Sequence, residues 1–201
     1  LFGSQAMAQI SFVKTIGTSA PSNNGTSTTI TVPAVGVAAG NSVIVSLAMS
    51  PAAGTVSCSD KRGNAYRSNR DVMNGSGTSG VRTVVLSAHN VIALTSGNTI
   101  TCTHPSVAAR ALSANEFSGL ATSSTVDVFT SSTGNSKSAS SGNTATTQAS
   151  ELLIGGIGVE GPSGDTFTAG TNYTAAGRTG TTGANPATNI TINPQYRIVS
   201  A

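Results

Sequence analysis

Alternation of apolar and polar residues at every second position is the feature that most constrains this chain. Around Cys102, the side chains of Ile100, Cys102 and His104 fall on one face of an extended chain, and the threonines between them fall on the other. This period of two is that of a β-strand with one buried side. Pro105 then removes a backbone donor, and a second strand-like run follows in residues 110–117. We therefore predict short strands joined by polar turns.

The same pattern recurs along the whole chain, and no stretch keeps a helical period long enough to predict a helix. Residues 42–49 are apolar on both faces, which predicts a central strand. Residues 131–150 are rich in Ser, Thr, Gly and Asn, a composition typical of a linker, although residues 144–147 inside it are a candidate edge strand. Further strands are expected in residues 9–16, 28–32, 55–60, 81–89, 126–132, 151–159, 166–169, 173–178 and 195–199.

Length and composition favour one all-β domain, a sandwich or a barrel. Charged residues make up only 8% of the 201 residues, and aromatic residues 4% with no Trp. A surface so poor in charge aggregates unless its edges are covered or it is built to assemble. The net charge is +3, but the basic residues are scattered and no aromatic residues lie among them, so we expect no nucleic-acid partner.

The two cysteines, Cys58 and Cys102, each lie on the apolar face of a predicted strand. If these strands are neighbours, a disulfide closes a long loop, which fits an extracellular protein. The alternative is a pair of inert core thiols, and the separation of the two Cα atoms decides between them. Metal binding is not expected, because no further Cys or His lies at ligand spacing.

Glycines in residues 156–161 match the G-x-G-x-x-G pattern of dinucleotide-binding loops. That pattern binds a pyrophosphate only where a helix begins at it, and no helix pattern follows here. We interpret the glycines as positions where another layer approaches an apolar strand closely. No cofactor is therefore expected.

Catalytic residues are not indicated by any spacing. The only histidines, His89 and His104, have no sequence relation to a serine nucleophile and a carboxylate, so we interpret them as polar residues at strand ends. Seven carboxylates are available for a glycosidase pair, but few aromatic residues are present for a sugar to stack on. Asp60 and Asn64 are candidate Ca²⁺ ligands, and the alternative that we favour is a turn stabilised by Asp60. We expect no enzymatic activity.

Four sequons occur, and because Ser and Thr are abundant they make glycosylation possible without indicating it. They begin at Asn24, Asn74, Asn172 and Asn189.

The first residues resemble the end of a secretory signal, with the small residues Ala6 and Ala8 flanking Met7. We interpret residues 1–14 as an arm of the mature protein that precedes a single domain of residues 15–201. No apolar run approaches the length of a membrane-spanning helix.

Several segments follow one another in a characteristic order: DKRGNAY at 60–66, SAHNV at 87–91, NTITCT at 98–103, RALSANEFSGL at 110–120, Val126-Asp127, ASELLIGG at 149–156 and QYRIVSA at 195–201. This order resembles a jelly-roll-like β-sandwich module of secreted bacterial surface proteins and phage virion proteins. The resemblance covers most of residues 27–201 and implies a fold together with a surface or assembly role.

One departure from that module suggests how the protein acts. Such modules usually continue after a segment like residues 197–199 with a turn and a last strand, and its absence would leave a groove and an open edge. The arm is a candidate to fill this groove, either in its own subunit or in the next one, where repetition gives a homopolymer. The expected subunit contacts are Phe2, Met7, Ile10, Phe12, Arg197, Ile198 and Val199.

We therefore expect a structural subunit of an extracellular or cell-surface filament or sheath that polymerises by N-terminal strand donation. A phage virion decoration or tail protein is one alternative, and a carbohydrate-binding module is another.

Overall fold

The computed structural model is an all-β protein, and it describes residues 9–123, 125–162 and 164–200. Apart from the short 3₁₀ helix η1 (Pro186–Thr188), its regular elements are strands. The strands are β1 (Ser11–Ser19), β2 (Gly25–Thr31), β3 (Ser42–Met49), β4 (Ser57–Asp60), β5 (Arg67–Ser76), β6 (Ser79–Ala88), β7 (Thr99–Val107), β8 (Arg110–Ser118), β9 (Glu151–Glu160), β10 (Thr174–Ala175), β11 (Thr179–Gly180) and β12 (Ile190–Val199).

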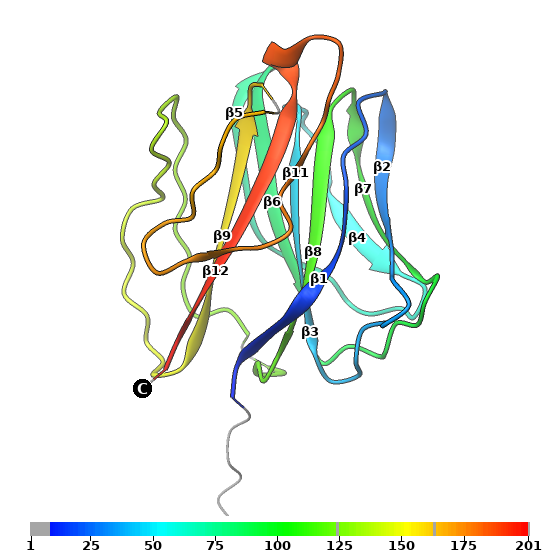
Figure 1. Ribbon diagram of the computed structural model, residues 1–201, viewed down its shortest axis with the longest axis vertical. Helices are drawn as coiled ribbons and strands as arrows, with labels where there is room; N and C mark the ends of the chain where they lie inside the picture. The colour runs from blue at the N-terminus through cyan, green and yellow to red at the C-terminus, as the bar shows by residue number, and fades with distance from the viewer. Residues whose placement is uncertain (1–8, 124, 163, 201) are drawn as a thin grey trace, which may run out of the picture.

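An antiparallel sheet in the order β1-β8-β3-β6-β5 forms the middle of the molecule (Figure 1). Its central strand β3 is buried at all eight positions. This confirms the prediction of a central strand, since residues that are apolar on both faces need a layer on each side.

One face of this sheet packs against the three-stranded sheet β2-β7-β4, and the two sheets form a β-sandwich. The core between them is aliphatic and contains Ile30 and Ile100 from the smaller sheet and Leu47, Leu86 and Leu112 from the larger one. The fold class predicted from the sequence is therefore confirmed.

The opposite face of the five-stranded sheet is covered by a third layer, in which β12 pairs with β9 on one side and with β10 and β11 on the other. The core here is small. Ile190 and Ile192 of β12 pack against Ala48, Ala109 and Ala111. The small side chains let β12 lie close to the five-stranded sheet, so few large side chains are needed to fill this interface.

Cys58 and Cys102 lie directly opposite each other in the pairing of β4 with β7 and form a disulfide. This confirms the predicted pairing of the two cysteines. Disulfides are typical of proteins that reside in oxidising compartments, which fits a secreted protein.

Within the described range 125–162, residues 126–132 and 144–147 are not strands, contrary to the prediction. Residues 125–150 instead form a long irregular connection between β8 and β9 (Figure 1). They are tied to β5 by Arg70, whose guanidinium lies 4.9 Å from the ring centre of Phe129 and donates to Ser131 Oγ at 2.9 Å. Phe129 remains 61% exposed, so this segment lacks the buried face that would stabilise a strand.

Among the residues that the structure describes, no helix is long and apolar enough to cross a membrane.

Candidate assembly surface

The start of β1 packs against the third layer of its own chain. The ring of Phe12 stacks on Tyr196 with centroids 4.8 Å apart and meets Phe117 edge-on at 5.4 Å. Residues 11–14 belong to β1 and pair with β8, so the predicted boundary after residue 14 falls inside a strand. Ile10 is half-buried just before this strand, whereas Phe2 and Met7 lie outside the described residues. The part of the arm that precedes β1 is therefore residues 1–10.

The other predicted contact residues, Arg197, Ile198 and Val199, form the end of β12. They pair with residues 151–153 of β9. On the opposite side β10 reaches only to Tyr196, so in the described part of the chain no strand covers residues 197–199 there. Because Phe12 stacks on Tyr196, the structure brings Phe12 next to this end of β12.

A longer open edge belongs to β9, which the sequence did not single out as an edge. All ten residues of β9 pair with β12, and no strand pairs with its other edge within the described ranges. Residues 152–159 of this strand carry no charged side chain. Long, uncharged edges of this kind pair readily with another extended segment.

Glycines on β9 explain how this layer sits on the central sheet. A Cβ atom at Gly156 would lie 2.7 Å from Val85 Cγ2, and one at Gly158 would collide with Thr83. The G-x-G-x-x-G match therefore lies on a packed strand, and these glycines serve the close approach of two layers, as the sequence indicated.

The two histidines lie in hydroxyl networks. His89 Nδ1 is 2.9 Å from Ser42 Oγ, and His89 Nε2 is 2.9 Å from Ser87 Oγ. Both serines are about 2% exposed or less, which leaves no room for a substrate at either hydroxyl. Burial lowers the pKa of His89. The arrangement joins β3 to the end of β6.

His104 is buried on β7, where its Nε2 lies 3.0 Å from Thr28 Oγ1 and its Nδ1 lies 2.8 Å from the Pro105 carbonyl oxygen. Burial is the largest effect on its pKa and lowers it. His104 thus links β7 to β2.

Asp60 stabilises a turn, the interpretation favoured over Ca²⁺ binding. Its Oδ1 accepts the backbone N–H groups of Arg62 and Asn64, and its Oδ2 accepts Asn64 Nδ2 and the Tyr66 hydroxyl. Burial, followed by the charge and the hydrogen bond of Asp60, raises the pKa of Tyr66. Four donors therefore occupy this carboxylate.

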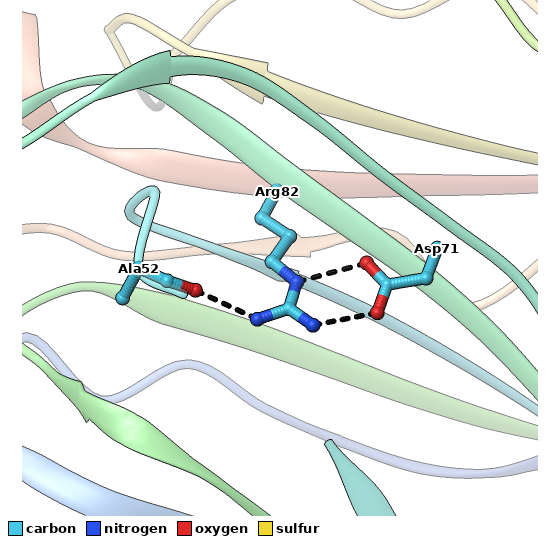
Figure 2. Close-up of polar contacts among 3 residues, drawn as sticks. All are labelled: Ala52, Asp71 and Arg82. Carbon is cyan, nitrogen blue, oxygen red and sulfur yellow. Dashed lines mark hydrogen bonds and ion pairs between the residues drawn. The ribbon is translucent and has the colours of Figure 1, made fainter. Parts of the chain in front are cut away.

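Arg82 is a buried cation with a carboxylate partner. From β6 it donates to both carboxylate oxygens of Asp71, at 2.8 and 2.6 Å, and to the Ala52 carbonyl at 2.7 Å, as Figure 2 shows. The hydrogen bond to Asp71 raises the pKa of Arg82. This bidentate pair fixes the loop after β3 against β5 and β6.

Arg110 is a buried cation whose recorded partners are all neutral. It donates to Thr28 Oγ1 at 3.1 Å and to the carbonyl groups of Asn23, Ser27 and Val107. Burial lowers the pKa of Arg110. Asn23 precedes β2, and Ser27 and Thr28 belong to it, so Arg110 holds the first part of β2 and the residue before it on β8.

One polar cluster joins three segments that the sequence did not connect. Glu116 of β8, which is fully buried, binds Lys14 Nζ at 2.5 Å through Oε2. Its Oε1 accepts Asn41 Nδ2 at 2.7 Å and the Ala38 N–H at 2.8 Å. Burial raises the pKa of Glu116, but hydrogen bonds from Lys14, Asn41 and Ala38 outweigh it, so the pKa is lowered.

Lys14 and Glu116 also border an open depression of about 520 Å³ between β1 and the loops before β3 and β7. In the sequence, Glu116 is the single carboxylate of the segment 110–118, and this residue alone does not identify Lys14 and Asn41 as its partners.

The sequons differ in accessibility. Asn24 and Asn172 are exposed, and Asn74 is half-buried and donates to the Gly134 carbonyl. Asn189 is 3% exposed, and its Oδ1 accepts Thr181 Oγ1 and the Gly183 N–H. In the folded protein Asn189 is therefore closed to a glycosylating enzyme.

Comparisons of the chain with protein-family models, with curated proteins and with solved structures found no match. The functional argument therefore depends on the geometry described above.

Proposed function

We propose that this protein is a structural subunit of an extracellular filament or sheath, in which the N-terminal arm of one subunit adds a strand to β9 of the next. The observation that carries the proposal is the open edge of β9. It is a ten-residue strand paired on one side only within the described part of the chain, and it has no charge from residue 152 to residue 159. Strand addition to such an edge gives affinity through main-chain hydrogen bonds.

The arm suits this edge in length and chemistry. Residues 1–10 are uncharged, and Phe2, Ala6 and Ile10 share one face if the arm is extended. Ten extended residues span about 33 Å, the length of a ten-residue strand such as β9. Residues 1–10 would therefore be long enough to pair along the whole edge.

The end of β12 belongs to the same acceptor layer, because residues 197–199 pair with the first residues of β9. β1 begins at the end of the molecule where β12 ends (Figure 1), so the residues that precede β1 are attached at that end. A contact between two different surfaces of the same chain is heterologous, and when it does not close into a ring it produces a filament.

Residues 125–150, which connect β8 to β9, must leave this edge accessible to the arm. Their contacts with β5 are polar or cation–π contacts formed by Arg70 and Asn74. Contacts of this type at the surface contribute little stability individually. We therefore expect this segment to yield to a paired strand.

Deletion of residues 1–10 tests the donor. The truncated protein keeps all of β1, so we expect it to fold and to remain monomeric by light scattering, whereas the full chain forms filaments in electron micrographs. Filaments formed by the truncated protein would refute the proposal.

Substitution of Val159 by Lys tests the acceptor. Val159 is 36% exposed on β9, so the fold tolerates the change, but a lysine at an edge opposes strand addition. The matched control is Val35→Lys, which adds the same charge at a loop residue that is 80% exposed. We expect only Val159→Lys to abolish filaments, and equal polymerisation of the two variants would exclude β9 as the acceptor.

A further inference from the structure

Lys14, Asn41 and Glu116 form a cluster whose chemistry goes beyond an ion pair. The amine of Lys14 lies 2.5 Å from Glu116 Oε2, and the carboxamide nitrogen of Asn41 lies 2.7 Å from Glu116 Oε1. The amine and the carboxamide therefore meet at the two oxygens of one carboxylate. The three residues come from β1, from the turn before β3 and from β8.

These groups are the components of an acyl transfer. A lysine amine becomes a nucleophile once a base removes its proton, and a carboxylate at hydrogen-bond distance can remove it. The side-chain amide of Asn41 supplies the carbonyl carbon, and its nitrogen leaves as ammonia when it receives a proton. When both reactants are held in one site, the reaction no longer needs two molecules to meet in solution, and its rate rises strongly.

We propose that Lys14 and Asn41 join in an intramolecular isopeptide bond, with Glu116 as the catalytic acid and base. Glu116 takes a proton from the Lys14 ammonium group, and the neutral Nζ attacks Cγ of Asn41. The Nζ–Cγ bond forms, and the Cγ–Nδ2 bond breaks as Glu116 passes the second Nζ proton to the departing nitrogen. Ammonia then takes up the proton left on Glu116, so the products are one amide and one ammonium ion, and no oxidant or co-reactant is needed.

The surroundings of the cluster fit this reaction. The Ala38 N–H donates to Glu116 Oε1 at 2.8 Å, which orients the carboxylate. Asn41 follows Gly40, which adopts a positive φ of 82° and turns the chain so that the Asn41 side chain reaches Glu116. The side chain of Lys14 is 23% exposed and borders the open depression, through which ammonia can leave.

The bond would cross β8. Glu116 is opposite Lys14 in the pairing with β1 and opposite Val43 in the pairing with β3, so the link would tie β1 to the entrance of β3. This cross-link does not depend on the proposed assembly. β1 directly follows the arm in the chain. If a neighbouring subunit pulls on the arm, the link would keep β1 in its domain.

Intact mass spectrometry of the full chain, denatured and with its disulfide reduced, tests the proposal. We expect a mass lower than that of the sequence by one ammonia. Trypsin should fail to cleave after Lys14, and fragmentation of the peptide that contains residues 14–41 should give no backbone fragments between the two linked residues. A full sequence mass for the wild-type protein would overturn the inference.

Variants separate the isopeptide bond from a cyclic imide, which also forms from asparagine with loss of ammonia. Lys14→Arg keeps a cation beside Glu116 but places there a guanidinium that stays protonated, so it cannot attack. We expect Lys14→Arg, Asn41→Ala and Glu116→Gln each to restore the full mass. An ammonia deficit that persists in Lys14→Arg would assign the loss to an imide and refute the bond. If Glu116→Gln fails to fold, Lys14→Arg and the wild-type mass still decide the matter.

Discussion

The two faces of the five-stranded sheet are covered in different ways. On the β2-β7-β4 side the core is built from large aliphatic residues such as Leu47, Leu86 and Leu112, and a disulfide joins β4 to β7. On the β9–β12 side, alanines and glycines let two isoleucines approach the sheet closely. The first interface therefore gains its stability from buried area, and the second from close packing with little area.

Because of this difference, we expect the stability of the domain to depend mainly on the first interface and the proposed assembly to depend on the second. The edge of β9 belongs to the layer with the smaller core, so a strand that joins β9 would add to an interface with little apolar area of its own. The opposite sandwich keeps its core and its disulfide whether or not β9 has a new neighbour. We expect perturbations of the two interfaces to have separable effects on stability and on polymerisation.

The largest effect is expected from removing the disulfide of the first interface. Cys58→Ala with Cys102→Ala opens a loop with a sequence separation of 44 residues. The chain-entropy model then predicts a loss of about 4 kcal/mol in the free energy of unfolding. Urea denaturation measures this loss.

The control for that experiment is the double variant in reducing buffer, which should be no less stable than in oxidising buffer. The folded fraction should still form filaments, because β9 and the disulfide-bonded strands β4 and β7 belong to different sheets. If filaments disappear while the domain stays folded, the two interfaces are not independent.

The parts of this fold that the sequence predicted are those in which local pattern and burial agree. Residues 42–49 are apolar on both faces, and they form the central strand. Cys58 and Cys102 share apolar faces and pair, and Asp60 stabilises its turn. Residues 126–132 show a strand-like pattern but form none, because tertiary packing gives them no buried side.

The Lys14–Asn41–Glu116 cluster was beyond prediction for a different reason. Asn41 and Glu116 are 75 positions apart, and they meet only because β8 inserts between β1 and β3. Strand order of this kind is set by the competition among all possible pairings, which alternation alone does not resolve. Nothing in the sequence around Glu116 identifies Lys14 or Asn41 as its partner.

A smaller effect is expected from adding volume to the second interface. Gly156→Val would place a Cβ atom 2.7 Å from Val85 Cγ2, so β9 must move away from β6. Overpacking of this kind costs about 1–3 kcal/mol. The control is Gly134→Val, where nothing lies within 4 Å of the added Cβ atom.

Hydrogen exchange shows which strands lose amide protection in the Gly156→Val variant. We expect faster exchange in β9 and β12 while the amides of β7 keep their protection. Uniform acceleration in all three layers would show that the second interface is not a separate unit of stability.

The smallest effect is expected from mild acid, and the part that depends on His104 should act on the first interface. Burial lowers the pKa values of His89 and His104 below the ordinary 6.5, so below that pH the unfolded chain binds protons that the folded chain does not. Stability from these groups is complete above the unfolded pKa and falls as the pH drops toward the folded values. Urea denaturation at about pH 7.5 and about pH 5 should show a modest loss, reduced in His104→Gln, which cannot titrate. His104 lies on β7 and bonds β2, and its network does not reach β9. The part of the loss that His104→Gln removes should therefore leave hydrogen exchange in β9 unchanged. If that part of the loss appears first in β9, His104 does not act through the first interface.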